Sequence, residues 1–215
     1  MVKLDMDLDK LILEQIEDSQ NKILLEVGSH DDELTLKLAP HFKKVCSYYE
    51  FVKIPERSEG NIEIKKMPYV EVLKQLEKFD VILMVNEFHH FPDIWQKQTF
   101  EKLNTKQQLL LIEWDFTGNN DYYHLAFQNC KPLGEITKNI LEKAVENKVI
   151  KITNKITSKY ETVFNSKEEM INFFKFILPD HYPFGEKEFL EKVNNTQFPF
   201  VMWEGFNLYL INKFI

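Results

Sequence analysis

Two short polar segments, each directly after an apolar run, contain the side chains best suited to chemistry. GSHDD begins at Gly28 after the run KILLEV, and NEFHHFPD begins at Asn86 after FDVILMV. Histidine changes charge near neutral pH, so His89 and His90 are candidate bases that could remove a proton from a substrate. The alternative is that one ring packs beneath the following helix while the other is solvated.

Further carboxylates lie at predicted strand ends, whereas the sequence contains no pattern typical of a catalytic nucleophile. Glu87, Glu113 and Asp115 could orient an amine or a hydroxyl, and simple solvation is the alternative for all three. No serine or cysteine lies in a strand-turn-helix elbow, so the sequence marks no nucleophilic triad. Cys46 and Cys130 lie far apart without a partner at metal-ligand spacing, and we expect both to be reduced thiols.

A metal site is a weaker hypothesis for the same polar segments. Histidine and carboxylate are suitable ligands, and the residues concerned are His30, Asp31, Asp32, His89 and His90. Their spacing matches no known metal-binding pattern. We therefore expect no metal ion here.

The first half of the chain alternates between predicted strands and predicted helices. The expected strands are 22–27, 44–49, 61–65, 79–85 and 109–112, and the expected helices are an opening one that ends near 19–21, one over 68–78 and one containing Trp95 and Phe100. The segment ELTLKLAPHF is ambiguous, because it alternates like a strand but follows helix-capping acids. This order predicts a doubly wound, mostly parallel α/β sheet with helices on both faces.

The second half follows a different pattern. We expect a loop at Gly118, helices around Leu125 and over 133–145, and a strand over 149–164. Ser166 and Glu169 form a capping box for a further helix, and a closing strand over 201–214 is interrupted at Glu204 and Gly205. We expect a single domain over 1–215, in which 116–200 contains additions that could cap a site.

The sequence resembles class I S-adenosylmethionine-dependent methyltransferases from about Asn21 to Asp115. KILLEVGSHDDELTLKLAPHFKKV is similar to the first motif of that family, and KFDVILMVNEFHHFPD is similar to its fourth strand and the segment that follows. LLLIEWDF stands where the fifth strand is expected. The resemblance implies a Rossmann-like fold with antiparallel strands at the C-terminal end. The match to HHFPD favours a site-lining role for His89 and His90.

The resemblance also implies where S-adenosylmethionine would be bound. The implied cofactor-binding residues are Glu26, Gly28, Ser29, His30, Tyr49, Glu50, Met67, Asn86 and Phe88. The glycine-rich form of the first motif has three alternate glycines, of which only Gly28 is present. Tyr49 holds the position of the family's ribose-binding acid, and Glu50 follows it.

The acids after Gly28 have two interpretations. Asp31, Asp32 and Glu33 place carboxylates where the cofactor's own carboxylate would meet a helix N-terminus, and their repulsion should weaken its binding. Alternatively, this segment is a capped turn without a ligand. The leading functional hypothesis is a methyltransferase acting on a small molecule, and the competing one is a non-catalytic relative that serves as a binding or structural subunit. A third possibility is that the site is kept for a ligand that lacks a carboxylate.

Composition and charge limit the partners. The formal net charge of -7 disfavours general nucleic-acid binding, and the lysines over 148–159 are typical of a solvated strand face. The N-terminus resembles neither a signal peptide nor a membrane anchor, so we expect a cytoplasmic protein without membrane contact. The C-terminal aromatics could form ordinary core, a cap over the site or a homodimer interface, and they are Phe173, Phe174, Phe176, Phe184, Phe198, Phe200 and Trp203.

Overall fold

A single mixed sheet runs through the computed structural model, which describes residues 8–28, 32–50, 55–119, 122, 130–177 and 186–214. Its described strands lie in the order β3-β4-β2-β1-β5-β6-β8-β7. Their bounds are β1 Ile23–Val27, β2 Lys44–Tyr49, β3 Arg57–Glu59, β4 Ile62–Lys66, β5 Val81–Val85, β6 Gln108–Gly118, β7 Ile150–Phe164 and β8 Phe200–Lys213. Strands β4, β2, β1, β5 and β6 are parallel, whereas β3, β7 and β8 pair antiparallel with their neighbours. The predicted fold class is confirmed.

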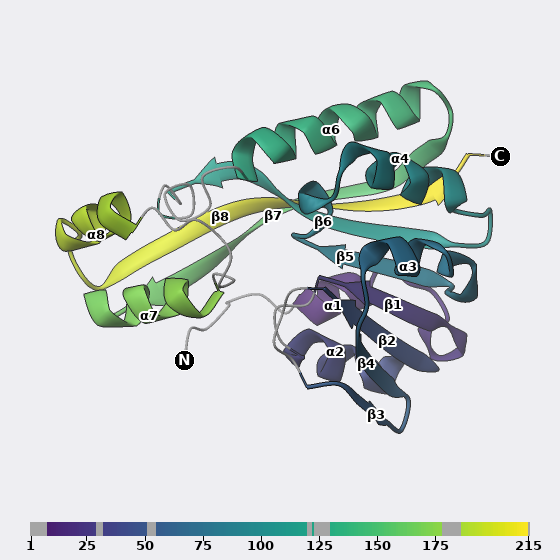
Figure 1. The fold of residues 1–215 in the computed structure, drawn as a ribbon, viewed down its shortest axis with the longest axis horizontal. Coiled ribbons are helices and arrows are strands. Elements are labelled where there is room, and N and C mark those ends of the chain that lie inside the picture. Colours follow the sequence, from purple (N-terminus) through teal and green to yellow (C-terminus); the bar gives the residue numbers. More distant parts are fainter. Residues whose placement is uncertain are drawn as a thin grey trace.

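Helices cover both faces of this sheet (Figure 1). They are α1 Leu8–Leu13, α2 Glu33–Leu38, α3 Tyr69–Leu73, α4 Asp93–Lys102, α6 Cys130–Glu146, α7 Lys167–Ile177 and α8 Glu186–Asn194. One hydrophobic cluster joins the sheet to α3, α4 and α6, and a second joins it to α1 and α2. No helix in the described ranges is long and apolar enough to cross a membrane.

The central strands are buried because their sequences are apolar on both faces. Leu24, Leu25 and every residue from Val81 to Met84 are inaccessible to solvent. Each such side chain contributes about 1.5–3 kcal/mol relative to its exposed state. This burial explains why short runs without polar alternation form parallel strands in the middle of the sheet.

The ambiguous segment ELTLKLAPHF forms helix α2 and a short 3-10 turn over Ala39–His41. A strand would place Leu34, Leu36 and Leu38 on one face. In the structure Leu36 is 44% exposed, whereas Thr35 and Leu38 are fully buried three residues apart. The helix is therefore selected by the face that meets the sheet, and not by the alternation of leucines.

Two strands extend further than their local patterns predict. The expected loop at Gly118 is the end of β6, which continues past Asp115 after a register shift. Strand β8 passes through Glu204 and Gly205 without a break. A Cβ on Gly205 would lie 2.3 Å from Asp115 Oδ1 and 2.3 Å from Thr117 Oγ1, so this glycine makes room for the bulged neighbour and does not end the strand.

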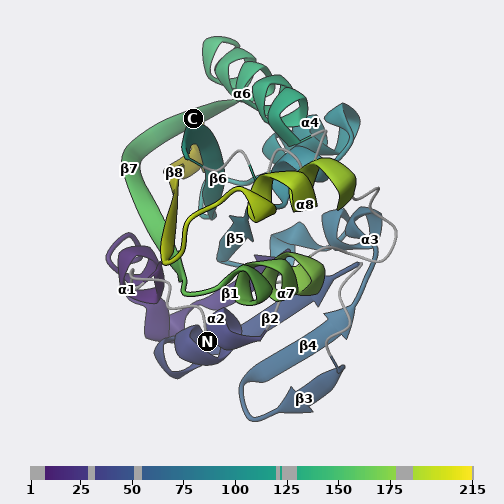
Figure 2. The same cartoon turned by 90° about the vertical axis from the view of Figure 1, so that its left-hand side faces the viewer.

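The long β7–β8 hairpin carries α7 and α8 beyond the carboxyl ends of the parallel strands. Figure 1 shows both helices at the far end of the hairpin, and Figure 2 looks from that end, with α7 and α8 in front of the sheet. They enclose a third hydrophobic cluster whose buried members are Tyr122, Phe164, Met170, Phe174, Phe189, Val193 and Met202. We call this unit, α7, α8 and the hairpin tip, the cap. Phe173, Phe198 and Phe200 pack against it, whereas Phe176 and Phe184 fall outside the residues whose side chains are described.

The predicted capping box begins helix α7 with a small variation. The Glu169 backbone N–H donates to Ser166 Oγ at 3.2 Å, as expected. Glu169 Oε2 accepts from the backbone N–H of Asn165 at 2.8 Å, which is one residue earlier than in the standard box. The box still satisfies two donors at the start of the helix.

Candidate functional site

Several of the predicted site residues that the structure describes lie where the parallel strands end. Strands β1, β2, β4, β5 and β6 all run in the same direction, so their carboxyl ends form one edge of the sheet. Ligands of open α/β sheets bind at such an edge, near the point where the strand order reverses. The segments that follow β1 and β5 meet at this point.

Gly28 marks the contact between these two segments. Its φ of 88° lies in a region that side chains disfavour, and a Cβ at this position would lie 2.3 Å from Glu87 Cβ. Glycine therefore permits a close approach here, as the resemblance implies, but the approaching group in the structure is the Glu87 side chain. The neighbouring residues Ser29, His30 and Asp31 lie outside the described residues.

Glu87 has an unusual environment for a carboxyl group. Its pKa is raised from 4.5 to about 7, chiefly by desolvation and also by the charges of Glu113 and Glu50, while His89 opposes them. The residue is half-buried, and its carboxyl group lies close enough to Glu113 and Glu50 to feel their charges. A carboxyl that titrates near neutral pH at a ligand-binding edge has the properties of a general base.

His89 and Glu113 form a buried pair beside Glu87. His89 Nδ1 lies 2.6 Å from Glu113 Oε2, and the His89 backbone N–H donates to Glu113 Oε1 at 3.3 Å. With Glu113 ionised, Nδ1 is the donor, and the carboxylate holds the ring in one orientation. His89 is only 1% exposed, whereas His90 is partly exposed and its ring centroid lies 4.1 Å from that of His89.

Asn86 presents an unused acceptor at the end of β5. Its φ is 51°, and its backbone N–H donates to the carbonyl oxygen of Ile112 at 2.8 Å. The side-chain Oδ1 is buried and has no hydrogen-bond partner within the described part of the chain. A buried acceptor without a partner costs about 1–3 kcal/mol, so a ligand that donates to Oδ1 would recover part of this energy.

The residues at the end of β2 differ in orientation. Tyr49 is the last residue of the strand and is buried, and desolvation raises the pKa of its hydroxyl. Glu50 turns toward α3, where its Oε2 accepts from the backbone N–H of Tyr69 at 3.2 Å. Glu50 thus places an acidic group beside the edge, although strand alternation predicts the opposite direction.

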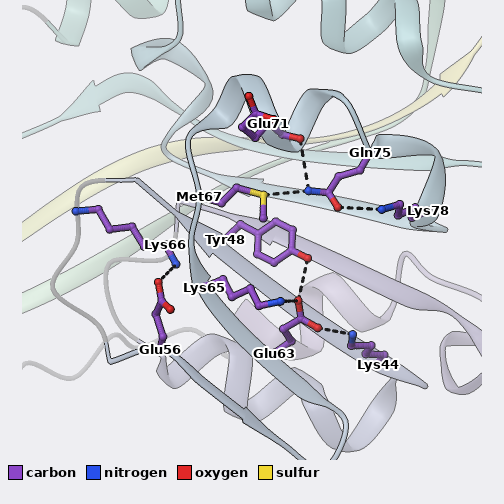
Figure 3. Close-up of polar contacts among 10 residues, drawn as sticks. All are labelled: Lys44, Tyr48, Glu56, Glu63, Lys65, Lys66, Met67, Glu71, Gln75 and Lys78. Atoms are coloured by element: carbon purple, nitrogen blue, oxygen red, sulfur yellow. Dashed lines mark hydrogen bonds and ion pairs between the residues drawn. The ribbon is translucent and has the colours of Figure 1, made fainter.

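Met67 follows β4 and lies against α3. Its backbone N–H donates to the Tyr49 carbonyl at 2.8 Å, and its sulfur accepts from Gln75 Nε2 at 3.0 Å (Figure 3). Beside it, Glu63 accepts from Lys44 Nζ at 2.5 Å and pairs with Lys65 Nζ at 2.7 Å. These hydrogen bonds lower the Glu63 pKa to about 2. Lys65, which lies within β4, is therefore held in a surface ion cluster with Glu63 and Lys44.

Two predicted contact residues point into the protein interior. Glu26 is 1% exposed, and its Oε2 accepts from the Thr35 hydroxyl, which connects β1 to α2. Phe88 is fully buried, with ring centroids 6.1 Å from Phe91 and 5.4 Å from Phe100. Both side chains therefore have contact partners inside the protein.

Two of the acids after Gly28 are ion-paired. Asp32 Oδ2 lies 2.7 Å from Nη2 of Arg57, which is the only arginine of the sequence, and Glu33 Oε1 lies 2.7 Å from Lys37 Nζ. Both pairs are partly exposed and individually weak. They nevertheless reduce the negative charge that was expected to repel a ligand carboxylate.

A cavity of about 130 Å³ lies between α6 and the sheet, and the sequence did not reveal it. It is lined by Leu111, Glu113, Trp114, Asp115, Gly134, Glu135, Thr137, Lys138, Leu141, Lys155, Asn207 and Tyr209. Glu113 belongs both to this lining and to the pair with His89. A usable signal was Thr137, a polar residue on the apolar helical face of Ile140, Leu141 and Ala144.

No group of three or more histidine, cysteine, aspartate or glutamate side chains in the described ranges could hold a metal ion. His30 and Asp31, two of the five residues considered for such a site, lie outside those ranges. His89 is engaged by Glu113, and Asp32 is engaged by Arg57.

No protein-family model matches the sequence, and no curated protein matches it. Solved structures do match. A proposed methyltransferase from Bacillus halodurans C-125 has a TM-score of 0.61 at 15% identity, over 97% of this chain and 99% of that protein. An S-adenosylmethionine-dependent methyltransferase from Anabaena variabilis has a TM-score of 0.54 at 12% identity, over 96% of this chain and 82% of that protein. A cyclopropane synthase from Mycobacterium tuberculosis has a TM-score of 0.52 at 11% identity, over 95% of this chain and 82% of that protein. The chain has the class I S-adenosylmethionine-dependent methyltransferase fold.

Proposed function

We propose that this chain is an S-adenosylmethionine-dependent methyltransferase that acts on a small molecule, with the cofactor bound where the segments after β1 and β5 meet. The observation that supports this function best is the Glu87 carboxyl, which lies against Gly28 and has a pKa of about 7. The group stands at the junction of the two segments that resemble the family's first motif and fourth strand.

The charge of this edge fits the cofactor. S-adenosylmethionine carries a sulfonium and an ammonium against one carboxylate, so its net charge is positive, whereas the demethylated product S-adenosylhomocysteine has lost the sulfonium charge. Glu50, Glu87 and Glu113 make the edge negative, and Asn86 Oδ1 is an acceptor for an ammonium or amino N–H. A negative site of this kind favours the cofactor over its product.

The protein's own contribution to catalysis would be orientation and proton removal. An acceptor hydroxyl or amine must lose a proton during methylation, and Glu87 titrates near the pH at which a base is most effective. The His89–Glu113 pair lies behind Glu87, and the partly exposed His90 is the imidazole that a substrate could reach. The net charge of -7 favours a small acceptor over a polyanion.

One specific observation favours the second candidate, a non-catalytic relative. The close approach that Gly28 permits is filled by Glu87, whose Cβ lies 2.3 Å from the position of a Gly28 Cβ. Cofactor binding therefore requires the Glu87 side chain to rotate away. If it cannot, this contact closes the site and the fold serves as a binding or structural subunit.

Calorimetric titration with S-adenosylmethionine and S-adenosylhomocysteine separates these candidates. A cofactor that requires ionised Glu87 should bind about tenfold more weakly at pH 6 than at pH 8, because the ionised fraction changes by that factor around a pKa of about 7. Glu87→Gln should weaken binding and remove the pH dependence, whereas Glu101→Gln, an exposed acid on α4, should change neither. No heat and no thermal stabilisation at millimolar cofactor would reject the enzyme and leave the non-catalytic candidate.

A further inference from the structure

We infer that the cavity between α6 and the sheet is a binding site for a small aliphatic amine in its cationic form. The cavity brings the carboxylates of Glu113 and Asp115 together with the Thr137 hydroxyl and with aliphatic and aromatic walls. This cavity shares Glu113 with the proposed cofactor edge, but neither Gly28 nor Glu87 lines it. Binding of the amine needs no cofactor, so the inference does not depend on the proposed function.

The Thr137 hydroxyl is the group that indicates a ligand. Thr137 is 4% exposed, and its Oγ1 is buried without a hydrogen-bond partner within the described residues. Helical threonines usually donate to a carbonyl of the preceding turn, and this one does not. A polar atom left without a partner in a cavity wall is a place where a bound donor or acceptor adds stability.

The sign of the charge in the cavity favours a cation. Glu113 is buried and Asp115 is half-buried, so both carboxylates act across little water. The pKa of the Tyr209 hydroxyl is raised by desolvation and then by the negative charges of Glu113, Asp115 and Glu142. An ammonium group placed here would experience the same negative potential.

Lysines also line the cavity but do not reverse this potential. Lys138 and Lys155 are exposed, and Lys155 Nζ lies over the ring of Tyr209 at 5.3 Å from its centroid. Water around these exposed ammonium groups weakens their field in the cavity. Neither lysine is among the charges that shift the pKa of Tyr209. The position of Lys155 also shows that the Tyr209 ring accepts a cation on its face, as aromatic rings do.

Size and shape restrict the ligand to a few carbon atoms. A cavity of about 130 Å³ corresponds to about four water molecules. Leu111, Leu141 and Trp114 supply apolar surface for a short methylene chain. An ammonium has three donors, which the carboxylates and Thr137 Oγ1 can accept.

The site is tested by thermal unfolding and calorimetric titration with ethanolamine at constant ionic strength and without S-adenosylmethionine. Ethylene glycol, which replaces the ammonium by a hydroxyl, and glycolate, an anion of similar size, are the matched probes. We expect saturable stabilisation by ethanolamine alone. Equal stabilisation by ethylene glycol, stabilisation by glycolate in place of the amine, or no saturable response would overturn the inference.

Variants separate this cavity from nonspecific charge effects. Thr137→Val replaces the unpaired hydroxyl by a methyl group of similar size, so it should leave the fold intact and weaken ethanolamine binding about two- to tenfold. Asp115→Asn keeps an acceptor for Thr117 and should weaken binding further by removing a charge. Glu146 lies on α6 outside the cavity lining, so the control variant Glu146→Gln should bind ethanolamine with the affinity of the parent protein. Unchanged affinity in both cavity variants would place the amine elsewhere and refute the assignment.

Discussion

A methyl group placed on Gly28 should destabilise the protein strongly, because the backbone and a neighbouring side chain both oppose it. At a φ of 88°, Ala costs about 1–2 kcal/mol in backbone strain. The added Cβ would lie 2.3 Å from Glu87 Cβ and 2.6 Å from Glu87 Cγ, and such overpacking costs about 1–3 kcal/mol more. Gly28→Ala should therefore lower the free energy of unfolding by about 2–5 kcal/mol.

A double-mutant cycle separates the two contributions. Glu87→Gly removes the Cβ, Cγ and Cδ atoms that the new methyl group would meet, so Gly28→Ala in that background should cost the backbone strain alone, about 1–2 kcal/mol. The coupling energy between the two positions should then be about 1–3 kcal/mol. Gly60→Ala is the matched control, because Gly60 also has a positive φ, 58°, but has no atom within 4 Å of its Cβ position.

Urea unfolding followed by circular dichroism measures all of these variants. With a slope of about 2–3 kcal/mol per molar urea, Gly28→Ala should lower the midpoint by roughly 1–2 M. If Gly28→Ala costs no more than Gly60→Ala, or costs the same with and without Glu87→Gly, the segments after β1 and β5 are not in fixed contact. Glu87 would then not have to rotate before a cofactor binds.

Four further substitutions test the site, the sheet and the cap. Because the folded-state pKa of Glu87 is raised to about 7, Glu87→Gln should match the parent protein below about pH 4.5 and exceed its stability above pH 7 by up to about 3 kcal/mol in urea unfolding. Glu63, whose pKa is lowered to about 2, stabilises above its ordinary pKa, so the loss caused by Glu63→Gln at pH 7 should disappear as the pH falls from about 4.5 to about 2 in the same assay. Thr35→Val removes the hydroxyl that donates to the buried Glu26 and should cost about 1–3 kcal/mol, and a cost below 0.5 kcal/mol would contradict this role. Phe189→Ala should cost about 3–5 kcal/mol, and hydrogen exchange should show the loss in α7 and α8 while the protection of β1 and β5 is retained.

The order of strands and helices was predictable because it depends on local patterns. Apolar runs such as 79–85 can be buried only as central strands between two layers of helices, and parallel connections then restrict the topology. The segment that forms α2 was ambiguous for the opposite reason. Its leucines alternate like those of a strand, and only the sheet surface against Thr35 and Leu38 selects the helix.

Strand ends were less predictable than strand centres. The continuation of β6 to Gly118 depends on β8, which pairs with it from almost a hundred residues later in the sequence. The short strand β3 was missed because its three residues are polar and pair only with β4. Gly205 was expected to interrupt a strand, but it instead provides space for Asp115 and Thr117.

The candidate site was likewise predictable only in part from the local sequence. The sequence identified Gly28, His89 and His90 through a resemblance in two segments, and it identified Glu87 and Glu113 as acids at strand ends. It could not show that Glu113 holds His89, or that Glu87 lies against Gly28 and titrates near neutral pH.

The sequence alone determined which segments are buried and in what order they form the sheet, because hydrophobic periodicity is a property of neighbouring residues. The tertiary structure decided the chemistry of the edge. Desolvation and charge pairing depend on groups that approach through space, and the segments that meet at Gly28 are separated by almost sixty residues of chain. The same holds for the cavity beneath α6, where Glu113, Thr137 and Tyr209 come from three distant segments.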